Sequence, residues 1–181
     1  MPQRTIHVVR TGFADDHALD TAVSRAMLAR ASQGHVPETF RIHVPRRAVA
    51  FGKHDTLVPG YAAAAQAAFD QGFDPVLRLA GGRAAVFHER TLAFSWTIPD
   101  RDPTSGIRRR FETVSALMVR AFTRLGIESR VGEIPGEYCP GEYSVNLGGR
   151  AKVMGVRQRL GRRAAHVGGV VVVAGSEIVR R

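Results

Sequence analysis

Residues 139–155 of the chain read CPGEYSVNLGGRAKVMG. Apolar and polar residues alternate before Gly148-Gly149, and two adjacent glycines are typical of the two-residue turn that joins antiparallel strands. In that register Val145 pairs with Lys152, and paired residues point to the same side of a sheet. The segment therefore predicts a β-hairpin in which Lys152 shares a side with apolar residues, which are Tyr143, Val145, Leu147 and Met154.

Lys152 has two interpretations at this point. A lysine on an apolar face is costly unless it has a partner or loses its charge, as in an apolar slot that binds an acyl chain with a polar head. Alternatively, its stem covers the face while the amine reaches water. Cys139, the sole cysteine, lies thirteen positions earlier. A nearby cation would make its thiol nucleophilic, although a lone cysteine is also typical of a small buried apolar residue.

A second glycine segment, residues 78–88, reads RLAGGRAAVFH. Gly81 and Gly82 fall between two predicted strands, where glycines let the backbone approach a ligand and leave N–H groups free for an anion. Arg78 and Arg83 flank them and can add charge-assisted contacts to a phosphate or carboxylate. The alternative is a tight connection with two solvated arginines.

The remaining elements follow from periodicity and capping residues. Helices are predicted from Asp15 or Asp16, either of which can cap the first one, to about residue 33, and over 61–71 and 108–125. Short strands are predicted over 39–44, 48–51, 76–79, 84–87, 92–97, 127–131, 143–147, 150–154 and 167–174. This order predicts an α+β fold with a mixed, largely antiparallel sheet flanked by helices, which we expect on one side of it.

Composition places the chain among ordinary globular proteins. It has 181 residues, of which 44% are hydrophobic and 23% charged, as is typical of one domain. Lys and Arg number 26 against 16 Asp and Glu, a net charge of +10. This excess favours an anionic partner, although a solvated arginine-rich surface explains it equally well. No zinc-finger, RNP or basic-zipper signature is present, which argues against nucleic acid.

Several classes of protein are excluded by missing motifs. The sequence has no P-loop, no H-E-x-x-H and no G-x-S-x-G, and its seven histidines lack metal-ligand spacing, so no metal is expected. A single cysteine cannot form an intrachain disulfide. No apolar run is long enough to cross a membrane, and the first twenty residues lack the apolar stretch of a signal peptide. We therefore expect a cytoplasmic protein without a membrane partner.

The two glycine segments together resemble the lipoate–protein ligase and octanoyltransferase family, whose catalytic domain is shared with biotin–protein ligases. Residues 78–88, followed by Glu89 and by Leu-Ala-Phe-Ser at 92–95, resemble the acyl-binding loop of that family. They depart from its common pattern because one more residue separates Gly82 from His88.

The second segment is the more specific match. Lys152-x-x-Gly155-x-x-Gln158-Arg159, with His-Val-Gly-Gly at 166–169, resembles the lysine motif of the family and its following strand. Residues 136–143, which read GEYCPGEY, resemble the loop that carries the nucleophilic cysteine in members that move octanoyl groups between proteins.

The resemblance implies a biotin/lipoate protein ligase-like (class II synthetase-like) catalytic domain over residues 1–181. We expect it to be a single domain that lacks the C-terminal extension of the family. Lys152 and Cys139 are the implied catalytic residues, with Lys152 contacting the acyl carbonyl and any adenylate phosphate. The implied substrate-binding residues are Arg78, Gly81, Gly82, Arg83, His88, Gly155 and His166.

The implied function is transfer of a lipoyl or octanoyl group to a lysine of an acidic lipoyl-type carrier, such as glycine cleavage H protein or the E2-like component of a 2-oxoacid dehydrogenase. In one version Cys139 carries the acyl group as a thioester, Lys152 assists and no cofactor is required. In another, ATP with Mg²⁺ activates free lipoate as an adenylate and Cys139 is a bystander. A third alternative is a non-catalytic module that binds an acyl chain or a nucleotide.

Overall fold

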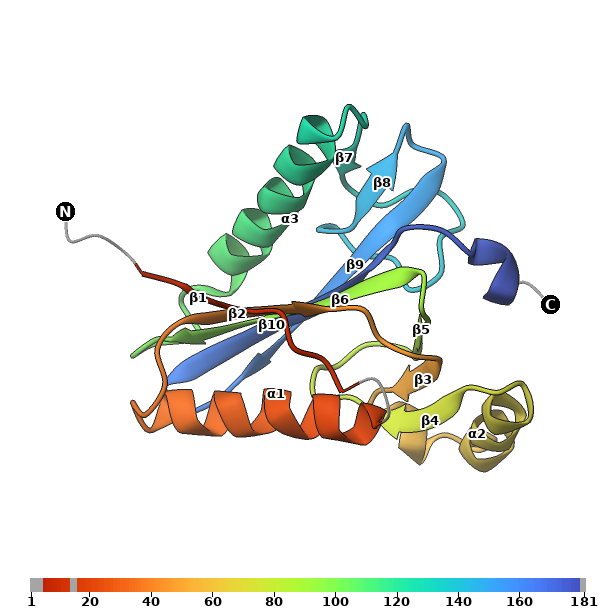
Figure 1. Ribbon diagram of the computed structural model, residues 1–181, viewed down its shortest axis with the longest axis horizontal. Helices are drawn as coiled ribbons and strands as arrows, with labels where there is room; N and C mark the ends of the chain where they lie inside the picture. Colours follow the sequence, from red (N-terminus) through yellow and green to blue (C-terminus); the bar gives the residue numbers. More distant parts are fainter. Residues whose placement is uncertain (1–4, 14–15, 180–181) are drawn as a thin grey trace.

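The computed structural model describes residues 5–13 and 16–179. A seven-stranded sheet has the order β1 (His7–Val9), β2 (Thr39–His43), β6 (Thr91–Pro99), β10 (Ala164–Val172), β9 (Ala151–Leu160), β8 (Val145–Leu147) and β7 (Arg130–Val131) (Figure 1). Its neighbouring strands are antiparallel except for β1 and β2, which run parallel. The predicted mixed, largely antiparallel α+β fold is confirmed.

A second, three-stranded sheet lies beside the large one. Its order is β4 (Asp74–Leu77), β3 (Ala48–Phe51) and β5 (Ala85–Phe87). A short 3₁₀ helix, η1 (Asp55–Leu57), follows β3, and another, η2 (Ser176–Val179), follows β10. This small sheet carries the predicted glycine segment, because that segment connects β4 to β5.

The three predicted helices are confirmed as α1 (His17–Ser32), α2 (Tyr61–Asp70) and α3 (Ile107–Arg124). The Asp16 carboxylate caps α1 by accepting a hydrogen bond from the Leu19 N–H at 3.0 Å. The alternative cap, Asp15, lies outside the described residues. In the part of the chain that the structure describes, no helix is both long and apolar enough to span a membrane.

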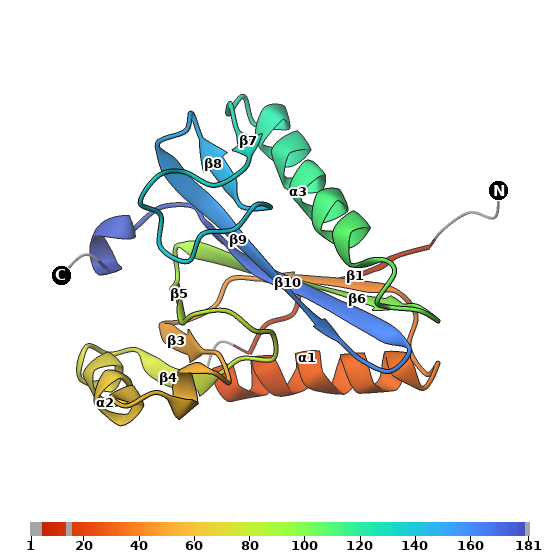
Figure 2. The same ribbon diagram turned by 180° about the vertical axis from the view of Figure 1, so that it is seen from behind.

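The helices cover both faces of the large sheet, so the expectation of helices on one side was wrong. In Figures 1 and 2, α3 lies against one face and α1 against the other. The cause is that β10 buries apolar side chains on both faces, with Val167 and Val171 in the core under α3 and Ala164 against α1.

The main core lies between α3 and the large sheet. It is formed by buried side chains, which are Phe94, Trp96, Ile98, Val114, Met118, Val145, Val153, Met154, Val156, Val167 and Val171. A smaller cluster of Leu28, Ala31 and Ala164 joins α1 to the opposite face. Apolar burial of this kind is the main source of folding free energy.

The face toward α1 and the small sheet is more polar and more open. One row across it consists of Arg41 on β2, Ser95 on β6, Gly168 on β10 and Arg157 on β9, each paired with the next. Serine and glycine leave space above the strands, whereas the alternate residues of the same strands fill the core under α3. This face therefore leaves room for a cavity.

All nine predicted strands are present, and two features of the sheet were not predicted. Strand β1 is only three residues long and mostly exposed, so it carries no alternating pattern. Strand β9 continues to Leu160, beyond the predicted end at 154, because its charged second half pairs fully with β10. That second half contains Arg157.

Candidate active site

A cavity of about 860 Å³ opens on the face of the large sheet that α1 and the small sheet cover. Most of the sequence-predicted site residues line it; they are Arg78, Arg83, His88, Cys139, Lys152, Gly155 and His166. Gly81 and Gly82 are not among its lining residues. Gly82 instead has a φ of 96° and lies beside two arginines that line the cavity, because an added Cβ would stand 2.7 Å from Arg157 Nε and 2.8 Å from Arg78 Nη2.

A β-bulge places Lys152 in this cavity. Val145 pairs with Met154, but the adjacent Asn146 pairs with Lys152, so β9 contains one extra residue between the two pairs. Val145 and Met154 pack in the core under α3, whereas the Lys152 Cε lies 3.7 Å from the position of a Cβ on Gly155, on the cavity side.

The predicted two-residue-turn register, with Lys152 opposite Val145 on an apolar face, was therefore wrong. The physical reason is that the bulge moves a charge out of the apolar core and toward polar partners. Bulges are frequent beside active sites for this reason, because they change the direction of one side chain.

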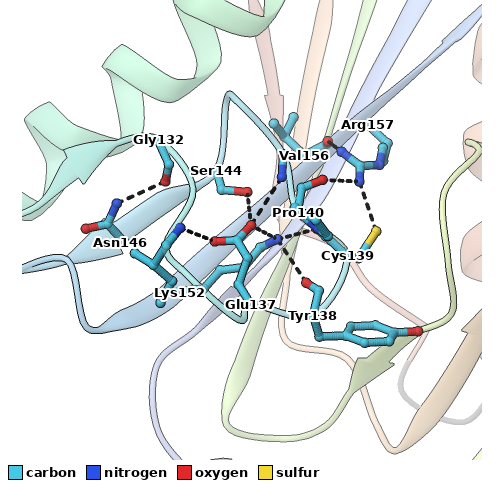
Figure 3. Close-up of polar contacts among 12 residues, drawn as sticks. Gly132, Glu137, Tyr138, Cys139, Pro140, Ser144, Asn146, Lys152, Val156 and Arg157 are labelled. Atoms are coloured by element: carbon cyan, nitrogen blue, oxygen red, sulfur yellow. Dashed lines mark hydrogen bonds and ion pairs between the residues drawn. The ribbon is translucent and has the colours of Figure 1, made fainter.

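The ammonium group of Lys152 is bound by the loop that carries Cys139 (Figure 3). It donates hydrogen bonds to Glu137 Oε1 at 2.9 Å, to the carbonyl of Tyr138 at 3.3 Å and to the carbonyl of Cys139 at 2.7 Å. Its side chain is only 21% exposed. The amine therefore does not extend into solvent, and it does not stand alone at the end of an apolar slot.

Glu137 is the buried partner of Lys152, and sequence reasoning did not select it. Its side chain is 2% exposed and also accepts hydrogen bonds from the N–H groups of Ile134 at 2.9 Å and Gly141 at 3.2 Å and from the Ser144 hydroxyl at 3.4 Å. Burial raises the pKa of Glu137, but these donors outweigh it and leave the pKa below its ordinary value. The available signal was its place two residues before Cys139.

Cys139 has a left-handed backbone, with a φ of 51°, and among the described residues it is the one non-glycine residue with positive φ. Such a conformation costs about 1–2 kcal/mol. It is held by the hydrogen bonds of Lys152 to the peptide carbonyls on both sides of the Cys139 Cα. Strain of this kind persists where the surrounding structure enforces it, as at active sites.

The thiol of Cys139 meets several positive groups. Arg157 Nη2 lies 2.9 Å from its Sγ. Burial works to raise the pKa of Cys139, but the Arg83 N–H, the Arg157 guanidinium and the charge of Lys152 together lower it below the ordinary value. The site can therefore form a thiolate at the cavity wall.

Arg78 and Arg157 are two guanidinium groups on the same side of the cavity. Arg78 Nη2 donates to the carbonyl of Arg83, while its Nε is buried without a hydrogen-bond partner. Burial and the like charge of Arg157 lower the pKa of Arg78. Among residues 5–13 and 16–179 neither arginine has an ion pair with a carboxylate. Arg157 was missed because a charged residue in a sheet row gives no local motif.

Two buried histidines complete the predicted set. His166 is 5% exposed, and burial lowers its pKa to about 4, so the ring is neutral at pH 7. Its Nδ1 has no hydrogen-bond partner. His88 Nδ1 accepts a hydrogen bond from the Arg90 N–H at 3.2 Å, and burial lowers the pKa of His88 as well. No group of three or more metal-ligating side chains was found in the described ranges.

A second polar cluster lines the part of the cavity formed by α1 and β2. Arg41 is 2% exposed and forms an ion pair with Asp20, and His43 Nε2 lies 3.4 Å from the same carboxylate. Sequence reasoning missed this cluster because Asp20 on α1 is more than twenty residues from Arg41 and His43 on β2.

The chain is similar to a known protein family, to curated relatives and to solved structures. Residues 16–177 match the family described as the lipoyl protein ligase A/B catalytic domain. The chain is 32% identical over 177 residues to the octanoyl-GcvH:protein N-octanoyltransferase of Geobacillus kaustophilus, which covers 95% of this chain and 59% of the relative. It is 28% identical over 163 residues to the lipoyl-GcvH:protein N-lipoyltransferase of Listeria monocytogenes, covering 90% of this chain and 57% of the relative.

The chain thus spans somewhat more than half the length of these two curated relatives. Among solved structures, the T. acidophilum protein Ta0514 superimposes with a TM-score of 0.79 at 18% identity, covering 94% of this chain and 69% of that one. This likeness concerns the fold alone. Since the family match covers nearly the whole chain, the protein belongs to the lipoyl protein ligase A/B catalytic-domain family.

Proposed function

We propose that the protein transfers an octanoyl or lipoyl group to a lysine of a lipoyl-type carrier domain, through a thioester on Cys139. The observation that carries this proposal is the thiol itself: it lines a cavity of about 860 Å³ and is surrounded by positive groups that favour the thiolate. The cavity has the volume of a typical small-molecule site. The transferase activities of the two relatives support the same reaction.

In the proposed reaction the Cys139 thiolate attacks the carbonyl of a donor acyl group, such as the N-acyl lysine of a carrier. A C–S bond forms, the C–N bond of the donor breaks, and the departing amine takes a proton from water. The neutral amine of the acceptor lysine then attacks the thioester. A new C–N bond forms, Cys139 leaves as a thiolate, and the amine gives one proton to water.

Lys152 is proposed to assist both steps. It holds the strained peptide of Cys139 through its hydrogen bonds to the carbonyls of Tyr138 and Cys139, and so positions the thiol. The acyl group is proposed to lie among the predicted substrate-binding residues that line the cavity, which are Arg78, Arg83, His88, Gly155 and His166, with Gly81 and Gly82 in the loop before Arg83. Within this set, His166 is neutral, and its buried Nδ1 has no hydrogen-bond partner.

The proposed acceptor is an acidic lipoyl-type carrier, such as glycine cleavage H protein or an E2-like component of a 2-oxoacid dehydrogenase. The net charge of +10 supports an acidic partner. Attraction between opposite charges speeds encounter, so the transfer rate should fall as salt rises. The proposed compartment is the cytoplasm, where a thiol such as Cys139 stays reduced.

A second candidate is ATP-dependent ligation of free lipoate, in which ATP and Mg²⁺ form an adenylate. The observation that favours it is the pair Arg78 and Arg157, which lack carboxylate partners in the described chain and suit a phosphate. No cofactor is required in the transferase version. A binding module without catalysis would use the same cavity and leave the carrier unmodified.

The deciding experiment incubates the protein with an octanoylated carrier domain and an unmodified acceptor domain, with and without ATP, and follows the mass of each species. We expect octanoyl transfer without nucleotide, and its loss in Cys139→Ser. Transfer that requires ATP, or that persists undiminished in Cys139→Ser, would overturn the covalent route. An acceptor whose mass never changes would indicate a binding module.

A further inference from the structure

We propose that Arg157 is a catalytic residue of this transfer: its guanidinium is the counter-ion of the Cys139 thiolate before the attack and again when the enzyme thioester breaks. The inference rests on the proposed function for the reaction itself. Stabilisation of the Cys139 thiolate by the Arg157 guanidinium is inferred from their contact and can be tested without any acyl donor.

The contact is direct and well fixed. Arg157 Nη2 lies 2.9 Å from Cys139 Sγ, while Nη1 donates to the carbonyl of Val156 at 3.1 Å (Figure 3). The second bond anchors the planar group to the backbone of its own strand, β9. An arginine held in this way presents one N–H to the sulfur, and a charge-assisted bond of this kind is stronger than one between neutral groups.

Glycines from two separate loops make room for the guanidinium. An added Cβ on Gly82 would lie 2.7 Å from Arg157 Nε, and one on Gly141 would lie 3.2 Å from Nη1. The cross-strand neighbour of Arg157 on β10 is Gly168. The glycine loop and the cysteine loop thus close around this side chain, and larger residues at 82 or 141 would displace it.

The distribution of charge points to the sulfur as the partner of Arg157. Lys152 is already neutralised by Glu137 at 2.9 Å. Arg157 and Arg78 have no carboxylate within ion-pair distance in the described chain. The acid that acts on Arg78 through space is Asp55, whose carboxylate is bound to the Gly52 N–H at 2.7 Å. Among the described residues, the acidic group next to Arg157 is therefore the thiol of Cys139.

The other groups that face the thiol have different positions. Arg83 donates its backbone N–H to the sulfur from the glycine loop, and the Arg78 guanidinium donates to the carbonyl of Arg83 in the same loop. On its own loop, Tyr138 precedes the cysteine and titrates at higher pH, since burial and the cysteine charge raise the pKa of Tyr138. Lys152 binds the peptide carbonyls of the loop rather than the sulfur. Lys152 is thus a positioning residue, and Arg157 touches the reacting atom.

The chemistry of acyl transfer requires such a residue. About 3% of an ordinary cysteine is ionised at pH 7, because its thiol pKa is about 8.5. A guanidinium counter-ion raises the thiolate fraction by more than it lowers the nucleophilicity of each thiolate. The same contact makes the sulfur a better leaving group when the acceptor amine attacks the thioester, since thiols of lower pKa leave faster.

The test measures the rate of alkylation of Cys139 by iodoacetamide from pH 5 to 10 in the wild type, Arg157→Gln and Arg157→Lys. Because Cys139 is the sole cysteine, the rate reports one thiol. We expect Arg157→Gln to raise the kinetic pKa by about one unit and to slow alkylation at pH 7 about tenfold. Arg157→Lys, which keeps the charge without the planar fork, should restore part of the rate.

The matched control is Arg162→Gln, which removes the same charge from an exposed residue in the turn between β9 and β10. It should leave the profile unchanged. A wild-type profile in Arg157→Gln, with its thermal unfolding unchanged, would overturn the inference, as would an unchanged octanoyl-transfer rate in that variant. Absence of transfer in the wild type rejects the proposed function alone, because alkylation needs no acyl group.

Discussion

The two faces of the seven-stranded sheet use alternate residues of the same strands for opposite purposes. Under α3, Val145 and Val167 are fully buried and Met154 is 1% exposed, and Val114 on the facing side of α3 is fully buried as well. On the other face the strands present His166, Arg157 and the glycines beside them, and the space above them forms the cavity. Burial dominates the first face, and polar contacts dominate the second.

This difference shows how the fold supports a strained and charged site. The cavity face contains a cysteine in the left-handed region, a neutral buried histidine and guanidinium groups without carboxylate partners. Each of these costs free energy, as functional sites commonly do. The apolar face offsets that cost, because each fully buried Val or Met side chain contributes about 1.5–3 kcal/mol.

The largest effect on the cavity face is expected from a substitution of Glu137. Its buried carboxylate forms an ion pair with Lys152 on that face. Glu137→Gln leaves Lys152 without its counter-ion, and we expect a loss of about 3–5 kcal/mol in the free energy of unfolding at pH 7. Urea unfolding measures it, with Glu133→Gln, an exposed glutamate in the same segment, as control. A loss below 1 kcal/mol would show that the loop is held by other contacts.

The same pair gives a pH dependence with a defined sign. The pKa of Glu137 in the folded state lies below its ordinary value of about 4.5. Its stabilising contribution is therefore complete above pH 4.5 and is lost as the pH falls through the folded-state pKa. In Glu137→Gln the loss of stability on acidification should be smaller than in the wild type.

On the apolar face, Met118→Ala tests whether stability and chemistry are separable. Met118 is 8% exposed in the core under α3, and its truncation should cost about 2–5 kcal/mol of stability. Met118→Leu keeps the volume and should cost less than about 1.5 kcal/mol. Below the unfolding transition, alkylation of Cys139 should proceed at the wild-type rate in both variants. A slowed rate in Met118→Ala would mean that the two faces are coupled.

The substitution with the smallest expected effect on stability at neutral pH is at His166. Burial lowers its pKa from 6.5 to about 4, so the unfolded chain binds a proton that the folded chain does not between these values. Stability should therefore rise with pH across that window, by about 3 kcal/mol in total. In His166→Gln the rise should shrink by this amount, while exposed His35→Gln keeps it. Equal slopes of stability against pH in the wild type and both variants would contradict the assignment of this pH dependence to His166.

Sequence periodicity was sufficient for the helices and for all nine predicted strands, because each has a local pattern or cap. It was insufficient for the register around Lys152. The same residues can pair with or without a bulge. The bulge is favoured because it avoids burying the charge of Lys152, but this can be predicted only when the polar partners of Lys152 are known. Those partners, on the loop of Glu137, are thirteen to fifteen residues away.

The predicted site residues came from the resemblance and from two glycine segments, and the structure places most of them around one cavity. Glu137 and Arg157 were missed for a common reason. Each acts by a contact between a loop and a strand, and neither belongs to a motif that spacing alone could reveal. The row that aligns Arg157 with Gly168 exists only once the sheet is assembled.

The most direct test of the account is the mass of the protein after exposure to an octanoyl thioester, such as octanoyl-coenzyme A, in the absence of nucleotide. The account predicts one octanoyl group on the wild type, mapped to Cys139, absent from Cys139→Ser and transferred when an acceptor carrier domain is added. A wild-type protein that stays unmodified while transfer proceeds, or an adduct on any other residue, would contradict it.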